Sequence, residues 1–157
     1  MKMEFAAIAA LLMLVTSAAA DANLTVSHGE TPNPTHIDLG TPGDSVGDQR
    51  IWNFPGSTGA GEPVVMNWMM TTTVLAGAGI ELEGRASTGI FTIGPDAKDS
   101  LIIQGMGFYP PTGSTLKASA KLERAIIGGT GKYSGARGSA VSTHFDDGTW
   151  QHEFTMQ

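Results

Sequence analysis

The chain has 157 residues, no cysteine and a formal net charge of −6. This length allows one domain with one sizeable hydrophobic core. The acidic balance excludes a basic surface for nucleic acid or anionic lipid, and the lack of cysteine excludes disulfides, a thiol nucleophile and a cysteine zinc site.

The first twenty residues have the pattern of an export signal. Lys2 precedes an apolar run over residues 5–15, and the small residues Ala18-Ala19-Ala20 follow it. The run is too short to span a bilayer. We therefore expect a signal peptide over residues 1–20, cleavage before Asp21 and a secreted mature protein that is not held in a membrane.

Residues 21–36 are rich in Pro, Gly and Thr, and this composition predicts an irregular arm ahead of a domain over residues 37–157. The arm and the residues after it could be drawn as a metal site. Their spacing matches no known ligand motif, so a solvated arm is the simpler interpretation and we predict no metal. The residues concerned are His28, His36, Asp38, Asp44 and Asp48.

Beyond the arm, short alternating segments separated by turn signals predict an all-β domain. The expected strands cover residues 49–54, 64–75, 80–86, 88–93, 100–109, 114–127, 138–145 and 149–156. Residues 117–124 are rich in helix formers, so a helix there is an alternative. Short connections favour an eight-stranded antiparallel β-barrel, because closure removes exposed strand edges and eight strands leave room for side chains or one small ligand.

The expected strand at residues 64–75 carries apolar groups on both faces. Met66, Trp68 and Met70 share one face, while Val65 and Met69 share the other. This pattern is typical of a barrel wall that lines a core inside and packs against a neighbour outside.

Residues 125–140 read AIIGGTGKYSGARGSA and resemble the signature of plant dirigent proteins, in which a Gly-Gly-Thr-Gly turn, an aromatic residue and Ala-Arg-Gly follow at this spacing. Residues 113–116 are similar to the start of the preceding dirigent strand. Ile103-Gln104-Gly105, followed by Tyr109, is similar to a strand of allene oxide cyclases. The resemblance covers about residues 37–156. It implies an eight-stranded antiparallel barrel, commonly trimeric, with an apolar central cavity.

Both families guide a reactive small molecule. Dirigent proteins steer the coupling of phenoxy radicals, and allene oxide cyclases hold an unstable epoxide while it closes stereoselectively. The resemblance implies that this chain binds and orients a small hydrophobic substrate without a cofactor, as an isomerase or cyclase or as a stereo-directing coupling protein. Restricting the conformers of a substrate in a dry cavity lowers the entropic part of the barrier. A non-catalytic carrier and an extracellular interaction module are the alternatives.

Four residues are the predicted catalytic contacts. Arg137 matches the arginine of the Ala-Arg-Gly motif, and Asp38 matches the acidic residue on the first dirigent strand. His152 lies between aromatic residues on one strand face, and Tyr109 supplies a hydroxyl. A hydrogen-bonded core histidine is the simpler interpretation of His152, while Arg137 could equally bridge strands through a carboxylate such as Asp146.

Six further residues are the predicted binding contacts, and they are Trp68, Met70, Gln104, Phe108, His144 and Trp150. The chain departs from the dirigent pattern at the second acid of that family. The position seven residues after Gly138 is Phe145, between His144 and Asp146.

Overall fold

The computed structural model describes residues 23–110 and 116–157, so the predicted signal peptide lies outside the described residues. These residues form strands and one short 3-10 helix, and none of their helices is long and apolar enough to cross a membrane. The elements are β1 (Asn23–His28), β2 (Thr35–Ile37), β3 (Gln49–Thr58), β4 (Pro63–Val74), β5 (Glu83–Ile93), β6 (Asp99–Tyr109), β7 (Lys121–Thr130), η1 (Gly131–Tyr133), β8 (Gly138–His144) and β9 (Trp150–Met156).

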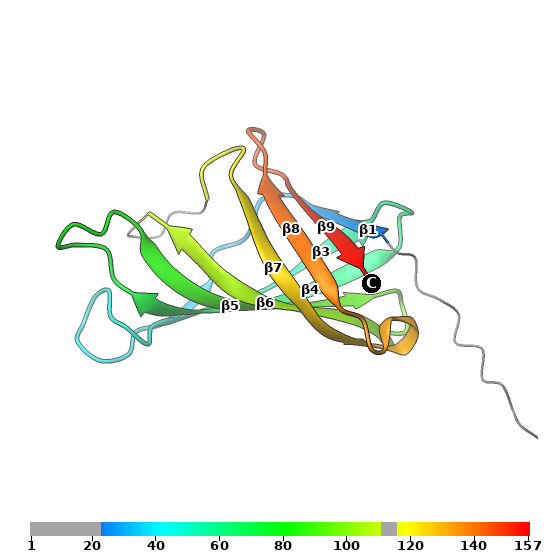
Figure 1. The fold of residues 1–157 in the computed structure, drawn as a ribbon, viewed down its shortest axis with the longest axis horizontal. Coiled ribbons are helices and arrows are strands. Elements are labelled where there is room, and N and C mark those ends of the chain that lie inside the picture. The colour runs from blue at the N-terminus through cyan, green and yellow to red at the C-terminus, as the bar shows by residue number, and fades with distance from the viewer. Residues whose placement is uncertain (1–22, 111–115) are drawn as a thin grey trace, which may run out of the picture.

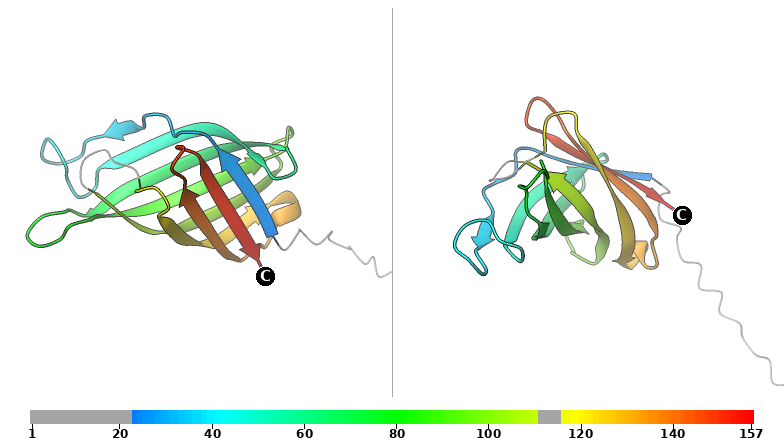
Figure 2. Two further views of the ribbon diagram at one scale, coloured as in Figure 1. Left: turned by 90° about the horizontal axis from the view of Figure 1, so that it is seen from above. Right: turned by 60° about the vertical axis from the view of Figure 1, so that its left-hand side comes forward.

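The strands close into a barrel (Figures 1 and 2). Each strand from β3 to β9 pairs antiparallel with the next, and β1 pairs with both β9 and β3, which joins the two ends of the sheet. The eight strands of the closed barrel are therefore β1 and β3 to β9, while the short strand β2 pairs with the free part of the β3 edge. The predicted eight-stranded antiparallel barrel is confirmed.

Residues 23–28, expected in an irregular arm, instead form β1, a complete strand of the barrel wall. Leu24, Val26 and His28 alternate toward the barrel interior, and every residue of β1 pairs with one of β9. The polar residues Thr25 and Ser27 face outward, so the strand is short and half polar, and its composition resembles that of a loop.

Two expected strand breaks are absent. β3 continues through Pro55 and Gly56, which pair with Val65 and Val64 of β4. A Cβ at Gly56 would lie 2.7 Å from the carbonyl oxygen of Ser27, so glycine lets β1 pass close to β3. Residues 80–86 and 88–93, expected as separate strands, contribute to the single strand β5, which pairs without interruption along β6.

The helix considered for residues 117–124 does not form. β7 begins at Lys121, and Leu122, Arg124 and Ile126 alternate toward the interior. The strand pairs with β6 on one side and β8 on the other, and this tertiary pairing outweighs the helix propensity of the local sequence.

The barrel interior is divided along its length. At the end where β4 begins, apolar side chains pack into a continuous core that includes Val64, Met66, Phe91, Ile93, Leu101, Ile103, Ile126, Ala140 and Phe154. At the other end, where β3, β5 and β9 begin, the inward side chains are largely charged or polar. The loops at residues 38–48 and 75–82 lie at this second end, on the left in Figure 1.

Two inward-facing glycines make room for large rings at the polar end. A Cβ at Gly89 would lie 2.7 Å from the Trp68 ring, and a Cβ at Gly107 would lie 2.7 Å from the Tyr109 ring. Gly89 is the direct partner of Trp68 across β4 and β5. The missing side chains therefore let both rings approach the backbone of the barrel wall closely.

Candidate functional site

The polar end of the barrel holds a cavity of about 390 Å³. This volume is in the range of sites that take small molecules. Aromatic rings form much of the wall, and they include all three tryptophans of the chain, Trp52, Trp68 and Trp150. Residues 31–34 lie at the mouth, where the Trp52 indole donates a hydrogen bond of 3.0 Å to the Pro32 carbonyl.

A buried carboxylate lies beside two arginines of this wall. One oxygen of Glu83 accepts hydrogen bonds from Thr72 at 2.7 Å, Arg85 Nε at 2.9 Å and Arg50 Nη1 at 3.4 Å. Burial alone would raise the pKa of the Glu83 carboxyl, but the hydrogen bonds from Arg85 and Thr72 and the two guanidinium charges outweigh it and lower the pKa. Glu83 is therefore ionised. Asp44 lies 3.8 Å from Arg50 on the other side.

A third arginine, Arg124, has no such carboxylate. It donates to the Ser87 hydroxyl at 2.7 Å, to the Tyr109 hydroxyl at 3.0 Å and to Ser142 at 3.5 Å, and it lies 5.0 Å from the Trp68 ring centre. Among the described residues, no acidic group lies within 4 Å of it. Burial lowers the pKa of Arg124, and the Tyr109 hydroxyl opposes this shift. The guanidinium remains a cation near neutral pH.

Two histidines of the cavity wall meet across the adjacent strands β1 and β9. The Nε2 atoms of His28 and His152 are 3.2 Å apart, His28 Nδ1 lies 2.6 Å from the Gly29 carbonyl oxygen, and His152 Nδ1 lies 2.8 Å from the Ser142 hydroxyl. Burial lowers the pKa of His28 to about 4, against the hydrogen bond to Gly29. Burial, followed by the charges of His28 and Arg124, lowers the pKa of His152 well below its usual value. Both rings are neutral near pH 7.

These contacts fix the direction of the hydrogen bonds. A carbonyl only accepts, so His28 Nδ1 carries hydrogen and its Nε2 is an acceptor. His152 must then donate from Nε2 and accept at Nδ1 from the Ser142 hydroxyl. Arg124, Ser142, His152 and His28 thus form one directed chain that ends at the Gly29 carbonyl.

Five of the ten predicted site residues line the cavity: Tyr109, His152, Trp68, Met70 and Trp150. His144 lies directly behind this lining. Its ring stacks on Trp150 with centroids 4.5 Å apart, and its Nδ1 is 2.8 Å from the Leu116 carbonyl oxygen.

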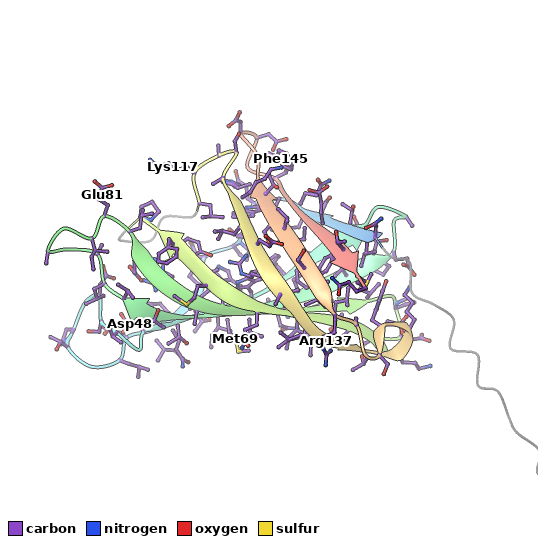
Figure 3. The ribbon with its side chains drawn as sticks, in the orientation of Figure 1. Asp48, Met69, Glu81, Lys117, Arg137 and Phe145 are labelled. Atoms are coloured by element: carbon purple, nitrogen blue, oxygen red, sulfur yellow. The ribbon has the colours of Figure 1, made fainter. Side chains whose placement is uncertain are left out.

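The structure places the other four predicted residues outside the cavity. Arg137 is exposed and donates to the Ala136 carbonyl at 2.7 Å, beside the turn that precedes β8 and at the opposite end of that strand from Phe145 (Figure 3). Asp38 accepts a hydrogen bond of 3.2 Å from the Gly43 amide in an exposed loop. Gln104 and Phe108 alternate with the inward residues of β6 and therefore face outward, with Phe108 53% exposed.

Sequence reasoning did not assign a site role to Glu83 or to the buried charged and polar residues of the lining, which are His28, Arg50, Arg85, Arg124 and Ser142. A signal for several of them was present. Arg50 lies an even number of residues from Trp52 and Phe54, so it shares their strand face. Arg124 shares a strand face with Ile126 in the same way. A single charged residue on the apolar face of a strand indicates a buried functional or structural charge.

The aspartates and histidines drawn as a metal site do not gather. Asp48 is buried and accepts the backbone amides of Leu39 and Ser45, each at 2.9 Å, and these two hydrogen bonds lower the pKa of its carboxyl. His36 lies 3.7 Å from the same carboxylate. Within residues 23–110 and 116–157, no cluster of three or more potential metal ligands is present. Asp48 organises the loop before β3.

No protein-family model matches the chain, and no curated protein matches it in sequence. Solved structures do match it. A pyocyanin demethylase superposes with a TM-score of 0.61 at 18% identity, over 86% of this chain and 98% of the demethylase. A pterocarpan synthase dirigent protein superposes with a TM-score of 0.54 at 17% identity, over 97% of this chain and 94% of the dirigent protein. The resemblance to the dirigent barrel is thus confirmed at the level of the fold.

Proposed function

We propose, from the barrel fold shared with a dirigent protein and a demethylase, that this chain binds and orients a small, largely apolar molecule in the cavity at the polar end of the barrel. The observation that carries the proposal is the cavity itself, about 390 Å³ with aromatic walls, next to a core that is closely filled at the other end. Protein interiors pack densely, so a space of this size beside a filled core is typical of a ligand site.

The lining suits a molecule with a flat apolar body and a few polar atoms. Trp52, Trp68 and Trp150 supply flat surfaces, and the arginines and Tyr109 supply buried hydrogen-bond groups that would fix one orientation. The ligand would therefore be held in one pose, as the steering of a reaction requires.

The directed chain from Ser142 to His28 supports a cofactor-free isomerase or cyclase activity. A proton taken up at the Ser142 oxygen would displace the hydroxyl hydrogen to His152 Nδ1 and the His152 Nε2 hydrogen to His28, with the positive charge resting on His28. Reversal of the same steps returns the proton to another atom of the substrate. A carrier without turnover would use the same cavity and leave the ligand unchanged.

Binding is tested by isothermal titration calorimetry with a panel of small aromatic compounds, after mass spectrometry of whatever co-purifies with the protein. Met70 lines the cavity and its neighbour Met69 faces outward (Figure 3), so Met70→Trp and Met69→Trp are a matched pair. We expect Met70→Trp to weaken binding by about tenfold or more, because the larger ring occupies the site, while Met69→Trp binds as the wild type does. Equal affinity of both variants would contradict a ligand in this cavity.

We also propose that the outer face of β3 to β7 joins copies of the chain into a homo-oligomer, with a trimer expected from the family resemblance. Large apolar side chains with 36% to 53% of their surface exposed lie on this face, with Ile51 and Met69 directly paired, and they are Ile51, Val65, Met69, Met106, Phe108 and Ile127. Patches of this kind mark protein contacts. Light scattering on the wild type should give a mass above that of one chain, and Met69→Lys with Phe108→Lys should reduce it to the monomer; a wild-type monomer would contradict this contact.

A further inference from the structure

Two buried nitrogen atoms of the cavity wall have no hydrogen-bond acceptor among the described residues. They are Nη2 of Arg85 and Nε1 of Trp68, on side chains that are 3% and 6% exposed. Buried donors are almost always paired, because an unpaired one has lost its hydration without compensation. Both side chains line the cavity, so a bound molecule is the natural source of the missing acceptor.

The charges of the same wall are unbalanced. Arg50 and Arg85 share the buried carboxylate of Glu83, and Arg50 also lies 3.8 Å from Asp44, whereas Arg124 has only hydroxyl partners. Arg85 and Arg124 also converge on one side chain, since Arg85 lies 4.7 Å from the Tyr109 ring centre and Arg124 donates to the Tyr109 hydroxyl. The excess positive charge and the two unpaired donors are therefore in one part of the cavity.

We propose that Arg85, Arg124 and Trp68 form an oxyanion subsite, which receives the carboxylate or phenolate of a flat, otherwise apolar molecule. The inference rests on the proposed function and deepens it by naming the ligand class. A hydrogen bond between a guanidinium and an oxyanion is stronger than one between neutral groups, and it is strengthened further where water is excluded. A ligand without an acceptor would leave both donors unpaired, so neutral hydrocarbons are the weaker ligands.

The test compares anionic probes with neutral probes of the same aromatic body. Naphthoate and its neutral amide, naphthamide, have the same flat body, and their affinities are measured by calorimetry at neutral pH. We expect naphthoate to bind about tenfold more tightly or better, from the usual strength of charge-assisted hydrogen bonds. Nitrophenolate and its methyl ether form the second pair, and a preference in only one pair identifies which oxyanion the subsite takes.

Variants then locate the preference. Trp68→Phe removes the indole N–H and keeps an aromatic ring, and we expect it to reduce the preference for naphthoate several-fold. Arg85→Gln should bring naphthoate and naphthamide to within about twofold of each other. Arg137→Gln is the matched control, because Arg137 is exposed and outside the cavity, and it should leave the preference unchanged.

Arg85 also pairs with Glu83, so Arg85→Gln is accompanied by the double variant Glu83→Gln with Arg85→Gln, which removes both charges of the pair. If either folds by circular dichroism and keeps the full preference, the assignment of Arg85 is overturned. Equal affinity of the wild type for anionic and neutral probes overturns the subsite and leaves the proposed function standing. Binding of no probe, with nothing co-purifying, overturns both.

Discussion

The imidazole rings of His28 and His152 are in hydrogen-bond contact through their Nε2 atoms, 3.2 Å apart, although 124 residues separate them in the chain. The contact exists because β1 lies against β9 in the register that pairs Val26 with His152. With both rings neutral, His152 donates and His28 accepts, and a proton added to His28 is compatible with the contact only when the His152 hydrogen moves from Nε2 to Nδ1.

We expect the protein to lose stability as the pH falls from about 6.5 to about 4. The pKa of His28 is about 4 in the folded protein and near 6.5 when the chain is unfolded, so over this interval the unfolded chain binds a proton that the folded barrel does not. The linked loss for His28 is about 3 kcal/mol of the free energy of unfolding, and His152 shifts in the same direction. Urea unfolding at several pH values measures it.

The matched control for this pH dependence is His36→Gln, because His36 is exposed at the surface, whereas His28→Asn removes a buried ring. We expect His28→Asn to make the pH profile shallower between these limits, with the remaining slope due to His152, and His36→Gln to retain the full slope. The groups that face His28, namely His152, His144, Trp150 and Phe54, include no carboxylate that would titrate in this interval. A profile that stays steep in His28→Asn would assign the dependence to another group.

Gly89→Ala should destabilise the barrel by about 1–3 kcal/mol, because the added methyl group would overlap the Trp68 ring. The displaced indole should also change the tryptophan fluorescence spectrum. Gly59→Ala is the control, since no atom lies within 4 Å of the position its Cβ would take. Thermal unfolding of the two variants tests this, and equal effects would contradict the close approach.

Tyr109→Phe should cost about 1–3 kcal/mol, because it leaves a buried guanidinium donor of Arg124 without its acceptor. If this is the cause, the same change should cost less in an Arg124→Met background. A double-mutant cycle by chemical unfolding measures the coupling. Additive effects would show that the loss comes from packing of the Tyr109 ring.

Expression in a host with a general secretion system should yield a mature chain that begins at Asp21, and intact-mass spectrometry measures its N-terminus. Replacing Ala18 and Ala20 with bulky residues should block cleavage at this site. Retention of the full 157-residue chain in the cytoplasm would contradict the predicted signal.

The barrel could be predicted from the sequence because apolar and polar residues alternate along most of its strands. Met66, Trp68 and Met70 alternate along β4, and the face they share points into the barrel. The cavity lining was less accessible, since an arginine in a sequence is normally a surface residue and its burial depends on partners that only folding supplies. Arg124 finds Ser87, Tyr109 and Ser142 on three other strands.

The motif match led to a wrong site prediction, because it placed Arg137 among the catalytic contacts and the structure places Arg137 outside the cavity. The Gly-Gly-Thr-Gly segment forms the last three residues of β7 and the first residue of the short turn η1, and Arg137 follows it at the end of the barrel away from the cavity. Residues that specify a turn identify the fold, because the chain must reverse there in any barrel of this type. They carry no information about which end of the barrel holds the cavity.

β1 closes the barrel, but it pairs much more extensively with β9 than with β3. β1 is joined to β9 through six residue pairs, but to β3 through only two, Val26 with Thr58 and Ser27 with Ser57. Local opening is favoured where the fewest backbone hydrogen bonds must break, so we expect this barrel to open first between β1 and β3. His28 directly follows the two residues of β1 that pair with β3. Opening between these strands would therefore also release His28, the last histidine of the directed hydrogen-bond chain.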